Sequence, residues 1–127
     1  MNFEKVVFGF FIVLALTLNF GFFVGDIDNP DHHHPMELGA ALAVSLIATI
    51  MKFGDRSQIG SVLLATSLVA DLQLLAAVFI WAYAGYVMEA GVTSEVLASI
   101  VSLSGGALLA NLVSVTLLVA ETITIRR

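Results

Sequence analysis

Four long apolar runs, separated by short polar segments, divide the chain. They cover residues 6–24, 36–53, 59–88 and 96–125. A hydrocarbon core about 30 Å thick is crossed by roughly 20 residues of α-helix. Each run is therefore about long enough for one crossing, and the last two exceed it, so tilted or protruding helices are expected. Lipid admits only helices or closed barrels, and uninterrupted runs of this length favour helices.

The pattern predicts an all-α integral membrane protein with one domain over residues 1–127. We expect four transmembrane helices, joined by loops 26–35 and 89–93 on one side and by the turn 54–56 on the other. The helices are expected at about residues 4–25, 36–53, 57–88 and 94–125. The first run is too long for the apolar segment of a secretory signal peptide, and no small-residue cleavage site follows it. We therefore expect a transmembrane helix that is not removed by cleavage.

The connections carry local signals for helix ends. Gly54 is suited to ending the second helix in a left-handed conformation. Asp55, with Gln58 three residues later, resembles a capping box for the third helix. Thr93 or Ser94 is the expected N-cap of the fourth helix.

Composition narrows the class of protein. Hydrophobic residues make up 59% of the chain and charged residues 12%, against about 25% charged in soluble domains. With no cysteine, disulfides, thiolate metal sites and cysteine nucleophiles are excluded. The net charge of −5 argues against nucleic acid as a partner. All three histidines lie in one loop, away from any nucleophile, so an enzyme is not expected.

The basic residues predict the orientation in the membrane. The chain has five basic residues, Lys5, Lys52, Arg56, Arg126 and Arg127. With four transmembrane helices all five lie on the same side of the membrane, whereas three or five helices would place some of them on each side. Basic loops face the cytoplasm, so we expect cytoplasmic termini and a multi-pass protein of a bacterial-type inner (plasma) membrane.

The opposite side is acidic. It receives six of the ten carboxylates and no Lys or Arg: Asp26, Asp28, Asp31, Glu37, Glu89 and Glu95. Clustered carboxylates raise the local concentration of cations and repel anions. The alternative is that the orientation rule alone removes basic residues from this side and leaves the acids by default.

Asp71 lies near the middle of the third helix. A carboxylate at that depth costs about 2.5–3.5 kcal/mol on insertion scales, so it is expected to face a polar cavity, a partner or the protein interior. One interpretation is an ion or proton site on a pathway. The alternative is a protonated acid that hydrogen-bonds a neighbouring helix and holds the two helices together.

Other polar residues recur at helical spacing and extend this hypothesis. Glu37, Ser45 and Thr49 share one face of the second helix, Ser67 precedes Asp71 by one turn, and Asn111 lies in the fourth helix. Such rows can equally be interhelical packing. The predicted ion pathway consists of Asp71, Glu37, Ser45, Thr49, Ser67 and Asn111.

The loop between the first two helices is a candidate metal site. His32, His33 and His34 follow Asp31, and imidazole with carboxylate suits Zn²⁺, Ni²⁺ or Cu²⁺. The aspartate spacing faintly resembles a calcium loop. A divalent ion at residues 26–37 is therefore one hypothesis, external pH sensing by the histidines is a second, and a plain solvated loop is the third.

The leading functional hypothesis is a cation-conducting channel. Four short helices barely enclose a pathway, so a symmetric homo-oligomer would build it, with the lipid bilayer and an inorganic cation as its other partners. The alternatives are a small transporter coupled to protons or divalent metals and a non-conducting accessory subunit of a membrane complex.

Overall fold

A computed structural model shows four α-helices and describes residues 3–25, 33–54 and 57–126, with side chains described up to residue 123. The helices are α1 (Phe3–Phe23), α2 (Pro35–Lys52), α3 (Gln58–Tyr86) and α4 (Ser94–Arg126). The four predicted helices are confirmed, and their ends differ from the predicted ones by at most two residues.

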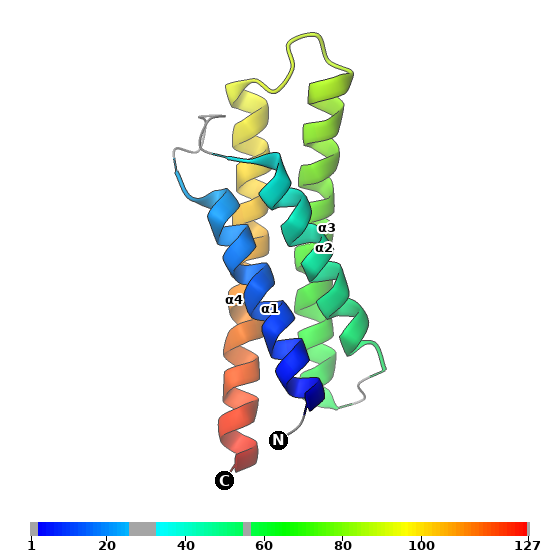
Figure 1. The fold of residues 1–127 in the computed structure, drawn as a ribbon, viewed down its shortest axis with the longest axis vertical. Helices are drawn as coiled ribbons and strands as arrows, with labels where there is room; N and C mark the ends of the chain where they lie inside the picture. The colour runs from blue at the N-terminus through cyan, green and yellow to red at the C-terminus, as the bar shows by residue number, and fades with distance from the viewer. Residues whose placement is uncertain (1–2, 26–32, 55–56, 127) are drawn as a thin grey trace.

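The helices form an antiparallel bundle in which successive helices run in opposite directions (Figure 1). Each helix packs against the next one in the chain, and α1 packs against α4, so the four close into a ring. Both termini lie at one end of the bundle, which we call the terminal end. At the other end, the loop end, α3 and α4 extend beyond α1 and α2. This follows from helix length, since α3 has 29 residues and α2 only 18.

Residues at the helix ends explain where the helices begin and stop. Gly54 follows α2 with a φ of +94°, as the left-handed ending requires. Thr93 accepts a hydrogen bond from the Val96 N–H and caps α4 as predicted. The capping box at Asp55 was wrong, because Ser57 is the N-cap of α3 and accepts from the Gly60 N–H at 3.0 Å. Ser57 directly precedes the first helical residue, where a short hydroxyl reaches the orphan amides.

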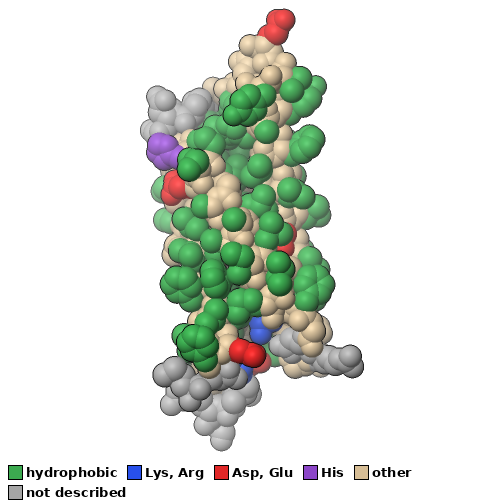
Figure 2. Space-filling view, turned by 45° about the vertical axis from the view of Figure 1, so that its right-hand side comes forward, with side chains coloured by type: hydrophobic (Ala, Val, Ile, Leu, Met, Phe, Trp, Pro, Cys, Tyr) green, Lys and Arg blue, Asp and Glu red, His purple; other side chains and the backbone are tan. Residues whose placement is uncertain are grey.

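The bundle has the surface of a membrane protein. All four helices are long and apolar enough to cross a bilayer. Figure 2 shows apolar side chains along most of the visible length, with charged side chains mainly near the two ends. Large exposed residues such as Phe10, Leu72 and Phe79 would be costly in water. The protein is therefore a multi-pass membrane protein in contact with lipid.

Two apolar clusters fill the bundle on either side of its middle. The cluster toward the loop end includes Phe22, Leu38, Leu97, Ile100 and Val101. The cluster toward the terminal end consists of Phe8, Ile12, Ala48 and Leu63. We call them the outer cluster and the inner cluster. All of these side chains are at most 2% exposed, so both ends of the interior are closed by hydrocarbon.

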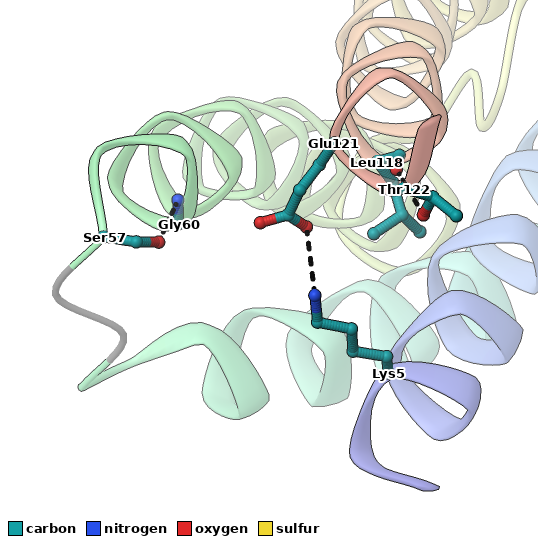
Figure 3. A network of polar contacts seen from close by, with 6 residues as sticks. All are labelled: Lys5, Ser57, Gly60, Leu118, Glu121 and Thr122. Carbon is teal, nitrogen blue, oxygen red and sulfur yellow. Dashed lines mark hydrogen bonds and ion pairs between the residues drawn. The ribbon is translucent and has the colours of Figure 1, made fainter. Parts of the chain in front are cut away.

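The terminal end is held by charged side chains. Lys5 of α1 and Glu121 of α4 form an ion pair at 3.9 Å (Figure 3). The Lys52 ammonium lies 4.3 Å from the centre of the Phe8 ring, a cation–π contact. A half-exposed ion pair adds little stability, but both contacts join helices and keep the basic groups at this end.

Two glycines of α4 allow close approach of neighbouring side chains. The Gln73 amide of α3 lies where a Cβ on Gly106 would be, and the Phe23 ring lies within 2.8 Å of a Cβ built on Gly105. Gly39 of α2, by contrast, has open space where its Cβ would lie. Close packing at Gly106 therefore positions Gln73 between α3 and α4.

The variant Gly106→Ala should destabilise the bundle by about 1 kcal/mol, the low end of the range for added bulk in a packed interior, because the overlapping Gln73 amide is the end of a flexible side chain and can move. The matched control Gly39→Ala should be neutral or slightly stabilising, by up to about 1 kcal/mol, since it only improves helix propensity. Thermal unfolding in detergent measures both. Equal transition temperatures for the two variants would contradict the close packing at Gly106.

Candidate functional site

The middle of the bundle is polar. Eight buried polar side chains from all four helices lie between the outer and inner clusters, and we call them the polar layer. They are Asn19, Ser45, Thr49, Ser67, Asp71, Ser104, Asn111 and Ser114. Polar groups inside a membrane cost free energy unless they are hydrogen-bonded. The polar layer is therefore our candidate for the functional site.

Asp71 lies at the centre of α3, with 13 helical residues before it and 15 after it. Its side chain is 7% exposed and turned toward α2. Ser45 Oγ donates to Asp71 Oδ1 at 2.6 Å, and Thr49 Oγ1 lies 2.5 Å from Oδ2. Ser45 and Thr49 are one turn apart on α2, which is why both hydroxyls reach the same carboxyl group. Among the described residues no cationic side chain pairs with Asp71.

The Thr49 hydroxyl has two acceptors and one hydrogen. Besides Asp71, it lies 2.9 Å from the backbone carbonyl oxygen of Ser45. A hydroxyl donates one hydrogen and accepts through its lone pairs. Thr49 therefore donates either to the carboxyl group or to the carbonyl. When it donates to the carbonyl, it accepts a hydrogen from a protonated Asp71.

Asp71 also reaches the outside of the bundle. It lines an apolar groove of about 540 Å³ between α2 and α3. Leu42, Leu46, Leu72 and Leu75 are among the groove's walls, with Thr49 beside Asp71. The carboxyl group is thus the polar point of an otherwise hydrocarbon surface, and it lies at the edge of the bundle rather than on its axis.

The remainder of the polar layer lies between α1, α3 and α4. Ser104 Oγ donates to Asn19 Oδ1 at 2.6 Å, and Thr66 and Ser114 share a hydrogen bond of 2.6 Å. Ser67 and Asn111, both predicted pathway residues, are fully buried. Neither side chain has a hydrogen-bond partner among the described residues. The structure thus separates the predicted pathway into an Asp71 group and an Asn111 group.

Glu37 is not brought to Asp71. It lies two turns from Ser45 along α2, toward the loop end, and its carboxylate contacts α1 at Gly21. Glu89 and Glu95 are exposed at the loop end. Asp26, Asp28 and Asp31 lie outside the described residues. A ring of acids at an external mouth therefore stays a prediction.

The histidine loop is divided by the structure. His33 is 1% exposed, and its Nδ1–H donates to the carbonyl oxygen of Phe22 in the last turn of α1. That carbonyl is one of the four that a helix end leaves without an intrahelical partner. His34 is exposed and precedes α2. His32 and Asp31 lie outside the described residues, so metal binding at this loop stays a prediction. His33 would bind a metal only through its other ring nitrogen, because Nδ1 bonds the end of α1.

Sequence reasoning missed how these residues pair. It placed Ser45 and Thr49 in a row with Glu37, whereas they contact Asp71. Gln73 points away from Asp71 and reaches α4 at Gly106. The adjacent glycines at 105 and 106 were the available signal, because small residues mark close helix contact.

Comparison with known proteins gives one match. No curated protein and no solved structure matches the chain. Residues 32–122 match a family of unknown function (DUF6394), and this region contains α2, α3 and most of α4. Because the match extends over more than half of the sequence, the chain belongs to this family.

Proposed function

We propose that this protein moves a cation across a membrane and that Asp71 is the residue that binds it. The observation that carries the proposal is the carboxyl group at mid-helix, held by two hydroxyls of α2 and open to the α2–α3 groove. An ionisable residue inside a membrane is costly, and such residues mark ion pathways and proton relays.

The proton is the cation whose binding this geometry explains. With Asp71 ionised, Ser45 and Thr49 both donate to it, at distances typical of hydrogen bonds to a carboxylate. With Asp71 protonated at Oδ2, the acid donates to Thr49, and Thr49 donates to the Ser45 carbonyl. In both states each oxygen of the carboxyl group has one hydroxyl partner, so rotation of the Thr49 hydroxyl preserves these hydrogen bonds when a proton is taken up or released.

A path through one copy would have to cross two hydrocarbon plugs. The outer and inner clusters close the bundle axis, whereas the groove gives Asp71 access to the surface. We therefore propose a symmetric homo-oligomer in which the α2–α3 groove faces a neighbouring copy. The pathway then lies between copies, where a neighbour can shield the carboxyl group from lipid.

The distribution of charge supports an orientation. Lys5 and Lys52 lie at the terminal end, and basic ends favour the cytoplasm. We propose that the terminal end is cytoplasmic, in a bacterial-type inner membrane. Glu89 and Glu95 then face outward and attract cations toward the loop end.

The variant Asp71→Asn should abolish proton movement. In vesicles with a pH gradient and an internal pH dye, the wild-type protein should dissipate the gradient. The variant should match vesicles without protein, since an amide cannot release a proton at working pH. Asparagine retains one acceptor and one donor for Ser45 and Thr49, so the fold should survive.

Glu121→Gln is the control, because it removes a different helical carboxylate, which is paired with Lys5. Its flux should equal that of the wild type. Asp71→Asn with wild-type flux would reject the assignment of Asp71. Wild-type protein that passes neither protons, sodium nor potassium would reject the function itself.

The variant Thr49→Val should slow proton movement by roughly tenfold. It removes a hydrogen bond to the ionised carboxylate, worth about 1.5–3 kcal/mol, and a weaker bond to the protonated acid, worth about 0.5–1.5 kcal/mol. The difference between the two bonds corresponds to roughly tenfold. The rate at which the pH gradient decays in the dye-loaded vesicles measures the change.

Two controls accompany Thr49→Val. Thr49→Ser retains the hydroxyl and should dissipate the pH gradient at the wild-type rate. Thr116→Val removes an exposed hydroxyl that bonds only its own helix at the Leu112 carbonyl, and it should have no effect. A wild-type rate of gradient decay in Thr49→Val would refute the role of the hydroxyl.

Copies should be in contact at the groove. Leu72 is 68% exposed beside Asp71, and Phe10 of α1 is 61% exposed on another helix. Because the chain has no cysteine, single variants Leu72→Cys and Phe10→Cys can be treated with a short bismaleimide in membranes. Leu72→Cys should give linked dimers and Phe10→Cys should give few. The reverse pattern would move the interface away from the groove.

A further inference from the structure

A second group of buried polar atoms lies between α1, α3 and α4. Five side-chain atoms in the described part of the chain are buried and have no hydrogen-bond partner. They are Asn19 Nδ2, Ser67 Oγ, Gln73 Oε1, Asn111 Nδ2 and Asn111 Oδ1. More than nine-tenths of buried polar groups in proteins are paired, so each of the five calls for a partner.

The five atoms follow one another along the interface of α3 and α4. Thr66 bonds Ser114, and Gln73 packs on Gly106, which sets α3 and α4 in antiparallel register. This register places Asn111 level with Val69, within one turn of Ser67, and Ser104 level with Leu75, about two turns from Ser67. Asn19 is held beside Ser104 by a hydrogen bond. The unpaired atoms therefore form a row roughly 12 Å long, contributed by α1, α3 and α4.

The kinds of atom identify the ligand. Two are amide nitrogens that donate, two are amide oxygens that accept, and the Ser67 hydroxyl does either. N–H donors repel a metal ion. The five atoms also include no carboxylate oxygen, so no negative group would balance the charge of the ion. Water both donates and accepts, and a buried water typically makes about three such bonds. The set suits water and not an ion.

We propose that the bundle holds a short chain of ordered water molecules, bound by Asn19, Ser67, Gln73 and Asn111. The outer and inner clusters enclose this water on both sides along the axis. Water in this position pairs the amides that the helices leave unpaired. The proposal rests on these amides alone, so it holds whether or not Asp71 moves a proton.

Radiolytic hydroxyl labelling in detergent, read by mass spectrometry, tests this directly, because X-rays produce radicals from water already inside the protein. Leu63 of the inner cluster lies one turn from Ser67, and Leu74 of the outer cluster directly follows Gln73. Leu97 also belongs to the outer cluster, but it lies about four turns from Asn111. All three are 0% exposed. Leu63 and Leu74 should be oxidised within milliseconds and Leu97 should not, although equal exposure would predict equal rates.

Two variants connect the labelling to the amides. Asn111→Leu preserves side-chain size and removes both polar atoms, and Ser67→Ala removes one hydroxyl. Each should lower labelling at Leu63 and Leu74 at least severalfold, while exposed Leu72 serves as the internal standard. Solid-state NMR of the wild type should also show transfer between water protons and the Asn111 amide nitrogen.

Labelling of Leu63 and Leu74 at the rate of Leu97 would overturn the proposal, as would an Asn111 amide with no transfer from water. The NMR measurement uses the unaltered protein, so it decides the question even if a variant fails to fold. Proton flux is not a readout here, and failure of the proposed function leaves this test unaffected.

Discussion

The Asp71 carboxyl group between two hydroxyls of α2 is the interaction on which the rest of the arrangement depends. At membrane depth there is no bulk solvent to hydrate a carboxyl group, so its partners must come from the protein. Ser45 and Thr49 supply them from successive turns of one helix. This fixes the rotation of α2 and its height against α3, because a shift of one residue would turn both hydroxyls away.

The same constraint orders the other helix interfaces. Asn19 and Ser104 join α1 to α4, and Thr66 and Ser114 join α3 to α4. Apolar contacts between membrane helices gain little over contacts with lipid, so small residues and hydrogen bonds set the register. In the described part of the bundle these hydrogen bonds between helices lie in the polar layer or directly beside it, and the larger hydrocarbon side chains fill the space toward both ends.

Much of the fold could be predicted from the sequence, because hydropathy and charge act over whole segments. Four runs gave four helices, and Gly54 and Thr93 marked ends correctly. The depth of Asp71 was predictable from its position in its run. The residues that pair with Asp71 were not predictable, because they depend on how α2 is rotated about its own axis when it packs against α3. The pairing of His33 with the end of α1 was also hidden, since adjacent histidines look equivalent until the chain turns one inward.

The central position of Asp71 has an electrical consequence. A proton that reaches this carboxyl group from either side of an energised membrane crosses only about half of the potential. At 100 mV this half corresponds to roughly 1 kcal/mol. The membrane potential would therefore change the fraction of protonated Asp71 several-fold. A residue at this depth would therefore register membrane voltage as well as acidity, without any moving charged helix.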